Sequence, residues 1–382
     1  MKIKHNFPPE LLQAPISERI SYFDECKIRH SMLDAVSTAL EQSLNSHSSP
    51  TVQLMPGPTG VGKSTIASTL FNRLLKAYEK QMAERQDFMP VMMVNAIAPN
   101  GPSFSWKDCF IRILERAKEP LIARKIIVPA QLTLFDDETP SAVRDGKVAD
   151  ALRRSVEKCL RRRGTRILII DEAHHILMVN NPKRLEFQFE ALKSLAIETK
   201  CTIVLVGTYN LLDIRDQSGQ LVRRSEITHF PRYDHKNPKD MVGFVQALNT
   251  LTSRLPLEQC PNLQANAIDF YHRTVGCIGI LKEWLSRAYA RHLETGNKNF
   301  DWEYIKTFSL SVKALETIAI EAMEGEEKLR DKPIDDLIDL LNRGISLKSN
   351  GNKDGPSKPK KPSLSVGKRS PARDPVGDAY AG

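Results

Sequence analysis

The sequence predicts an α/β fold with a parallel central sheet, followed by a region of helices alone. The apolar runs TVQLMPG (51–57), ILIID (167–171) and CTIVLVGT (201–208) are each followed by a helical pattern. ILIID shows no alternation of polar and apolar residues, which is typical of a strand buried on both faces of a parallel sheet. Strands that alternate with helices in this way form a layered sheet with right-handed crossovers.

The other elements follow from helical spacing and from turn residues. A lead-in helix is expected over 16–47, and MPVMMVNA (89–96) is expected as a further buried strand. Helices are expected over 106–118, 147–163 and 185–199, whereas the Pro, Asp and Gly residues of 129–146 predict a loop or insertion. From about 236 onward only helical patterns remain. We therefore expect four parts: a helical lead-in (1–50), an α/β core (51–235), a helical lid (236–345) and a disordered basic tail (346–382).

Composition restricts the class of protein. With 382 residues, 41% of them hydrophobic and 26% charged, the chain is predicted to be soluble and globular. The formal net charge of +9 favours a polyanionic partner, and residues 351–382 hold +4 of it, from seven Lys or Arg against three Asp. The six cysteines show no metal-binding spacing and are expected to be reduced. No apolar run reaches the length of a membrane span, so we expect a cytoplasmic location without membrane contact.

A phosphate-binding loop is predicted between the first strand and the helix that follows it. Gly57-x-x-x-x-Gly62-Lys63-Ser64 has the spacing that lets successive backbone N–H groups surround a β-phosphate at a helix N-terminus. Lys63 is expected to reach the β and γ oxygens and Ser64 to ligate Mg²⁺. The alternative is a chance match in a glycine-rich turn. The predicted cofactors are ATP and Mg²⁺, with the nucleotide held by Gly57, Pro58, Thr59, Gly60, Val61, Gly62, Lys63, Ser64 and Thr65.

Two acids follow the buried strand in ILIIDEAHH. Asp171 is expected to hold Mg²⁺ through water, and Glu172 to orient and deprotonate the attacking water. Nucleotide binding without turnover is the alternative. The two histidines could suggest a zinc site, but side chains at neighbouring positions are expected to diverge, and no H-E-x-x-H spacing exists. A DEAH-type helicase would need a second set of strands, which the helical region after 236 lacks.

Polar and basic residues further along the chain are candidates for sensing the γ-phosphate. Thr208 and Asn210 follow a central strand, and we favour Thr208 as the residue that positions the hydrolytic water, with a strand-to-loop cap as the alternative. Arg223 or Arg224 could reach the nucleotide of a neighbouring subunit, because a planar cation stabilises developing phosphoryl charge. Lys282, near the start of a predicted lid helix, could sense the nucleotide from the lid. Each of these basic residues could equally be a solvated surface charge.

The order of these motifs resembles that of a known family. GPTGVGKST, ILIIDEAHH, VLVGT, QLVRRS and GCIGILKEW, between about residues 15 and 300, are similar to the motifs of AAA+ P-loop ATPases, and their wording resembles the TnsC/TniB group of transposition regulators. The resemblance implies an AAA+ domain with a helical lid, and a lead-in segment, here ERISYFDECKIRH, that lies near the adenine. The chain departs from shorter members of that group in its insertion at 129–146 and its basic tail, and it has Lys282 where many AAA+ proteins have Arg.

The same resemblance implies a function. Members of that group assemble as rings or helical filaments on double-stranded DNA in the presence of ATP. They connect a target-selection protein (TniQ/TnsD-like or a CRISPR effector complex) with the transposase and disassemble when ATP is hydrolysed. The other function that we consider is an AAA+ signalling or secretion-type switch that acts on protein partners without DNA.

Contacts with DNA are the least determined by the sequence. Candidates lie where AAA+ proteins project elements into a central channel: Lys107, Arg144, Lys147, Lys183 and Arg184. Contacts with phosphates alone would suit a protein that binds many target sequences. Each of these residues could equally be a solvated charge.

Overall fold

The computed structural model describes residues 5–45, 52–101, 103–122, 141–178, 183–215, 225–259, 261–296 and 299–343. The chain forms two compact units, Met1–Arg330 and Asp331–Gly382. None of the described helices combines the length and the apolar character that crossing a membrane requires.

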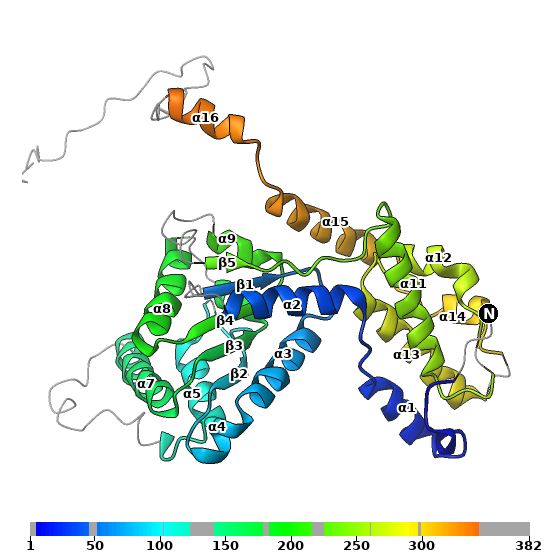
Figure 1. Ribbon diagram of the computed structural model, residues 1–382, viewed down its shortest axis with the longest axis horizontal. Coiled ribbons are helices and arrows are strands. Elements are labelled where there is room, and N and C mark those ends of the chain that lie inside the picture. The colour runs from blue at the N-terminus through cyan, green and yellow to red at the C-terminus, as the bar shows by residue number, and fades with distance from the viewer. Residues whose placement is uncertain are drawn as a thin grey trace, which may run out of the picture. The chain divides into compact units, whose positions relative to one another are not determined.

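A five-stranded parallel sheet forms the centre of the first unit (Figure 1). Its order is β2-β3-β4-β1-β5, and the strands are β1 (Val52–Pro56), β2 (Val91–Asn95), β3 (Ile167–Asp171), β4 (Thr202–Gly207) and β5 (Ser225–Ile227). The register pairs Asn95 with Asp171 and Pro56 with Gly207. The carboxyl ends of neighbouring strands therefore meet at one edge of the sheet. The predicted α/β fold with a parallel sheet is confirmed.

Helices cover both faces of this sheet (Figure 1). One face carries α2 (Ser31–Asn45) and α3 (Lys63–Ala77), and the other carries α5 (Trp106–Arg116), α7 (Ser141–Arg163) and α8 (Lys183–Thr199). The shorter elements of this part are α4 (Glu79–Glu84), η3 (Ala173–Leu177), η4 (Tyr209–Leu211) and α9 (Leu212–Arg215).

The side chains of β3 explain the uninterrupted apolar run. Leu168 and Ile170 belong to the cluster under α5, α7 and α8, whereas Ile167 and Ile169 belong to the cluster under α2 and α3. All four residues are buried because successive side chains of a strand point to opposite faces and both faces are covered.

The prediction of a single helix over 16–47 is wrong. The segment forms α1 (Ile16–Glu25) and α2, and the chain between them turns extended at Cys26, with φ −63° and ψ 116°. The two helices pack into different cores, since Phe23 of α1 joins a cluster of C-terminal helices while Leu33 and Leu40 of α2 pack under the sheet. A single continuous helix could not place these side chains in both cores.

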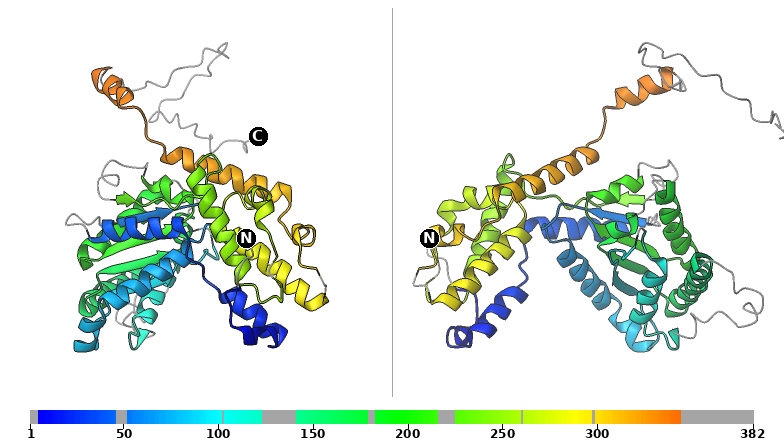
Figure 2. Two further views of the ribbon diagram at one scale, coloured as in Figure 1. Left: turned by 45° about the vertical axis from the view of Figure 1, so that its right-hand side comes forward. Right: turned by 180° about the vertical axis from the view of Figure 1, so that it is seen from behind.

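The C-terminal helices of the first unit share one core with α1 (Figure 2). They are α11 (Pro238–Ser253), η5 (Gln264–Asn266), α12 (Ala267–His272), α13 (Ile278–Thr295) and α14 (Trp302–Lys306), and η1 (Pro9–Leu12) precedes α1. Phe244, Phe270 and Trp284 are almost completely buried in this core. α15 (Val312–Leu329) completes the unit and packs against η4.

The expected loop over 129–146 and the expected tail are compared with the structure only where its residues are described. α7 begins at Ser141 rather than 147, so the last six residues of the expected 129–146 loop are helical. Residues 129–140 and the expected tail, 346–382, lie outside the described residues.

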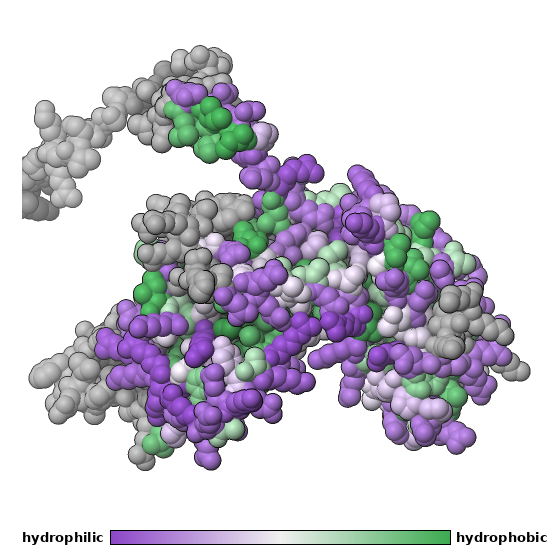
Figure 3. All heavy atoms as spheres, in the orientation of Figure 1, coloured by the Kyte–Doolittle hydropathy of each residue, from purple (hydrophilic) through white to green (hydrophobic). Residues whose placement is uncertain are grey.

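The second unit contains one described helix, α16 (Ile334–Arg343). Ile334, Leu337, Ile338 and Leu341 recur at helical spacing, and they are 65%, 48%, 46% and 71% exposed. Figure 3 shows the apolar surface that they form. α16 is thus an amphipathic helix with an exposed apolar face.

Candidate nucleotide site

A cleft of about 960 Å³ lies over the carboxyl edge of the sheet. Its walls come from five separate parts of the chain: the end of α1, the loop between β1 and α3, the segment after β3, the end of β4, and α13. The sheet topology explains why the cleft lies at this edge, because ligands of parallel α/β sheets bind outside the carboxyl ends of the strands.

The loop between β1 and α3 has the backbone that phosphate binding requires. Gly62 has φ +108° and begins α3 as its N-cap, a conformation that only glycine adopts without strain. The backbone N–H groups of Thr65 and Ile66 donate to the Gly62 carbonyl at 3.0 and 3.1 Å. Lys63 and Ser64, the first two residues of α3, line the cleft, and the N-terminus of this helix favours an anion there.

The same loop is pressed against the start of α13. A Cβ on Gly279 would lie 2.4 Å from the carbonyl oxygen of Gly60, and a Cβ on Gly60 would lie 2.5 Å from Ile280. The close approach is possible because both positions are glycine. The start of α13 and the loop consequently form one continuous wall of the cleft.

Lys63 is the buried cation of the cleft. Its side chain is 8% exposed, and its Nζ donates to the carbonyl oxygens of Gly57 at 3.0 Å and Pro58 at 2.8 Å. Burial lowers the pKa of Lys63, and the nearby Glu172 carboxylate opposes that shift. An ammonium has three N–H donors, so these two bonds leave one for an oxygen in the cleft.

The acids lie directly after β3. Asp171 is 4% exposed, and its Oδ1 accepts a hydrogen bond from the backbone N–H of Glu172 at 2.9 Å. Glu172 lines the cleft with φ +53°, a left-handed conformation that costs a non-glycine residue about 1 kcal/mol or more. The strained backbone turns the Glu172 side chain into the cleft instead of continuing the strand.

Thr208 also lines the cleft, at the end of β4. Its Oγ1 is buried and has no hydrogen-bond partner among the described residues. A buried hydroxyl without a partner is uncommon in proteins. The unused hydroxyl fits a ligand or an ordered water in the cleft, which is the environment expected for a sensor of the γ-phosphate.

The lid contributes one face of α13. Lys282 lines the cleft and donates from Nζ to the carbonyl oxygen of Asp24 at 2.6 Å. Ser286 and Arg287 lie one turn further and line the cleft too. Sequence reasoning missed both, although the helical spacing from Lys282 could have located Ser286.

A smaller adjoining pocket of about 60 Å³ lies between the α1–α2 connection and α13. It is lined by residues of the lead-in, including Cys26 and Ile28, and by Val61 and Ile278. Its apolar walls next to the phosphate loop suit a planar base. This is the part of the chain, ERISYFDECKIRH, for which the resemblance implies a place near the adenine.

The segment after β3 places two histidines beside Glu172. His174 and His175 both line the cleft, and their ring centroids are 4.2 Å apart. The expectation that these neighbouring side chains diverge is wrong, because η3 is a tight 3₁₀ turn that keeps them together. Burial, followed by the charge of His175, lowers the pKa of His174 to about 4.

Other predicted site residues lie elsewhere or outside the described residues. Arg223 and Arg224 lie outside them. Lys107 is in the first turn of α5, Lys183 begins α8, and Arg144 and Lys147 are in the first two turns of α7. Of these six residues the structure describes the side chain of Lys107 alone, and Lys107 does not line the cleft.

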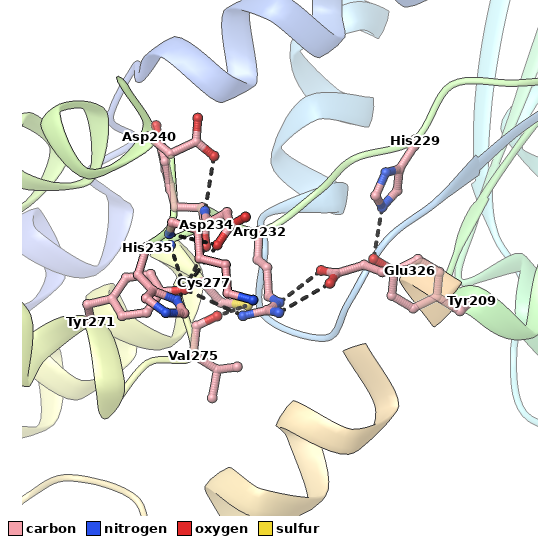
Figure 4. Close-up of polar contacts among 12 residues, drawn as sticks. Tyr209, His229, Arg232, Asp234, His235, Asp240, Tyr271, Val275, Cys277 and Glu326 are labelled. Carbon is pink, nitrogen blue, oxygen red and sulfur yellow. Dashed lines mark hydrogen bonds and ion pairs between the residues drawn. The ribbon is translucent and has the colours of Figure 1, made fainter. Parts of the chain in front are cut away.

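A polar cluster connects α15 with η4, the turn that follows β4 (Figure 4). The Tyr209 hydroxyl lies 2.8 Å from His229 Nε2, and a Cβ added to Gly325 would overlap the Tyr209 ring. Arg232 donates from Nε and Nη2 to the two carboxylate oxygens of Glu326 at 2.8 and 3.1 Å. The segment after β4 is therefore held in place by the last helix of the unit.

Comparisons with known proteins agree with this geometry. Residues 46–214 match a family model described as an AAA domain. Comparison with curated protein sequences gives no match. The cleft, the parallel sheet and this match define a P-loop nucleotide-binding protein. More narrowly, the fold is that of an AAA+ P-loop ATPase domain, followed by a helical region.

Three solved structures are similar to this chain to different degrees. The ORC2 protein of Aeropyrum pernix, in ADPNP–ADP complexes, has a TM-score of 0.50 and 16% identity over 78% of this chain and 74% of that chain. A Walker-type ATPase of Pyrococcus abyssi has a TM-score of 0.43 and 16% identity over 81% and 76%. Domain III of the replication initiation protein DnaA from Thermotoga maritima has a TM-score of 0.40 and 11% identity over 81% and 98%.

Proposed function

We propose that this AAA+ protein assembles with copies of itself on double-stranded DNA when it binds ATP, connects a target-selection protein with a transposase, and disassembles on ATP hydrolysis. The observation that carries the ATPase part is the single cleft in which Lys63, Glu172, Thr208 and Lys282 meet from four separate segments. The transposition part rests on the resemblance of the motifs to the TnsC/TniB group.

In the proposed reaction each residue has a separate task. The loop N–H groups and Lys63 bind the β- and γ-phosphates, and Glu172 takes a proton from the attacking water, which Thr208 positions. Ser64 and Asp171 would hold Mg²⁺, which neutralises phosphoryl charge when bound. Arg223 or Arg224 of an adjacent copy would complete the site, so that hydrolysis requires assembly.

The proposed DNA contacts share one edge of the fold. α5 and α8 each follow the carboxyl end of a strand, and α7 runs back to the start of β3, so all three helices begin at the carboxyl edge of the sheet. The starts of α5 and α8 are joined by a hydrogen bond from Trp106 Nε1 to Gln188 Oε1. A phosphate backbone that runs along this edge would meet the starts of the helices that carry Lys107, Lys183, Arg144 and Lys147.

Electron microscopy of the full chain with duplex DNA tests the proposal. Wild-type protein should form rings or filaments only with DNA and ATP together, and Lys63→Ala should form none. Glu172→Gln should bind ATP, hydrolyse it at least 100-fold more slowly and retain its assemblies, because the water-activating base is lost. A Glu172→Gln variant that hydrolyses ATP at the wild-type rate would show that Glu172 is not that base.

The proposed DNA contacts at the carboxyl edge of the sheet are tested by comparing the DNA affinities of two double variants. Lys107→Glu combined with Lys183→Glu should weaken DNA retention at least tenfold and reduce its salt dependence, while ATP binding stays unchanged. The matched control is Lys239→Glu with Lys313→Glu, in α11 and α15, outside that edge. Equal DNA affinity of both double variants would contradict the assignment.

The exposed apolar face of α16 favours contact with a protein and supports the second candidate, a switch that acts on protein partners without DNA. The same microscopy separates the two functions. Rings that need ATP but are indifferent to DNA would favour the protein-partner switch.

A further inference from the structure

The residues after β3 contain a group of potential metal ligands distinct from the predicted Mg²⁺ ligands Ser64 and Asp171. Glu172, His174 and His175 each offer one ligand atom, and these three atoms lie within 4.8 Å of one another. His174 Nδ1 and Glu172 Oε2 are 3.3 Å apart. Two ligands of a tetrahedral zinc ion are about 3.4 Å apart, as bond lengths near 2.1 Å require.

A second observation points to a ligand at the same place. The Nδ1 atoms of His174 and His175 are both buried, and within the described part of the chain neither makes a hydrogen bond. The approach of His174 to Glu172 lacks hydrogen-bond geometry despite its short distance. Buried ring nitrogens normally have a partner, so two adjacent ones without any require an explanation.

The backbone holds the group together. The left-handed Glu172 and the 3₁₀ turn that follows bring the three side chains to one side, with the histidine rings 4.2 Å apart. Gly207 of β4 leaves room for His174, because a Cβ there would lie 3.1 Å from the His174 backbone nitrogen and 3.3 Å from its Nδ1. The three ligand atoms, which lie within 4.8 Å of one another, would need to approach to about 3.4 Å to share one ion.

We propose that Glu172, His174 and His175 form a binding site for a divalent transition-metal ion of the zinc, cobalt or nickel class. Two imidazoles and one carboxylate select these ions over Mg²⁺, which prefers oxygen ligands. All three residues line the cleft, so a fourth coordination position is open to water. A bound ion is coordinated by the carboxylate of Glu172. Because the coordinated carboxylate cannot accept a proton, the ion inhibits any reaction that uses Glu172 as a base.

Binding of Zn²⁺ and Co²⁺ to the full-length protein, in excess Mg²⁺ and without nucleotide, tests the site independently of hydrolysis. Equilibrium dialysis should give one tightly bound Zn²⁺ per wild-type chain, and Co²⁺ should give the visible absorption of a tetrahedral nitrogen–oxygen site. His174→Ala and His175→Ala should each weaken Zn²⁺ binding at least tenfold and abolish the Co²⁺ spectrum. The control is His235→Ala, since the His235 side chain is 56% exposed and lies outside the group.

Folding of each variant is checked by circular dichroism, and His174→Gln and Glu172→Gln serve if an alanine variant fails to fold. Both should lose the Co²⁺ spectrum while keeping the far-ultraviolet signal. Wild-type Zn²⁺ affinity in either histidine variant, or no stoichiometric binding to the wild-type chain, would overturn the proposal. Slow ATP hydrolysis by protein free of zinc, cobalt and nickel, measured with Mg²⁺ and duplex DNA present, would count against the proposed ATPase and leave this metal site untouched.

Discussion

The contact between the phosphate loop and α13 can be tested with Gly279→Ala, a substitution that adds one methyl group. Gly279 lies in the first turn of α13, where alanine is normally preferred over glycine by about 1 kcal/mol. Helix propensity alone thus predicts that Gly279→Ala stabilises the protein. The structure predicts the reverse, because the new Cβ would lie 2.4 Å from the Gly60 carbonyl oxygen and 3.0 Å from its carbonyl carbon.

The steric effect should be the larger one. The opposing atoms are backbone atoms of a tightly turned loop, so they cannot move aside as the end of a flexible side chain would. Overpacking of this kind costs about 1–3 kcal/mol, and subtracting the gain of about 1 kcal/mol in helix propensity leaves a net destabilisation of up to about 2 kcal/mol. Displacement of Gly60 should also weaken ATP binding about tenfold, the equivalent of about 1.4 kcal/mol.

Guanidinium unfolding and titration with a fluorescent ATP analogue measure the two effects. The control is Gly101→Ala, because no described atom lies within 4 Å of the position of its new Cβ. If Gly279→Ala is as stable as the wild type or more so, and binds ATP equally well, then the lid does not hold the loop as the structure indicates.

Three further predictions concern single side chains. Lys63→Ala should weaken nucleotide binding at least 100-fold in a fluorescence titration, and it should lower the free energy of unfolding by about 1–3 kcal/mol in urea titrations, because the carbonyl oxygens of the buried Gly57 and Pro58 lose their hydrogen bonds. Burial lowers the pKa of His30 to about 4, so the unfolded chain binds this proton first as the pH falls. About 2 kcal/mol of unfolding free energy should be lost between pH 8 and pH 5, and His30→Gln should remove that part of the pH dependence in urea titrations. Glu326→Gln should cost about 1–2 kcal/mol in the same assay by leaving the half-buried Arg232 without its carboxylate, whereas the exposed Glu294→Gln should cost under about 0.5 kcal/mol.

The sequence was most informative where function fixes the local backbone. The glycines and Lys63 of the phosphate loop, and the acids after ILIID, have a spacing that requires one particular strand–turn–helix geometry. Thr208 could be placed because the carboxyl ends of parallel strands meet at one edge. Their arrangement in one cleft therefore follows from short-range patterns and sheet topology.

Contacts between distant segments could not be predicted in this way. Nothing near Phe23 indicates that α1 packs with α13, since an amphipathic stripe shows that a helix is buried but not against what. The proximity of His174 and His175 was missed for a different reason. Their spacing alone is typical of an ordinary helix or loop, in which neighbouring side chains diverge, whereas here the left-handed Glu172 starts a 3₁₀ turn.

The union of α1 with the lid has a consequence for how the protein is made. Asp24 and Lys282, which meet at the cleft, are 258 positions apart in the chain. At about 5–20 residues per second, a ribosome needs roughly 13–52 s to synthesise the intervening segment. During that interval α1 is already outside the ribosome while its packing partners do not yet exist. The α/β layers can form first, but the apolar face of α1 stays exposed at least until α13 has been synthesised, and the nucleotide cleft cannot close before then.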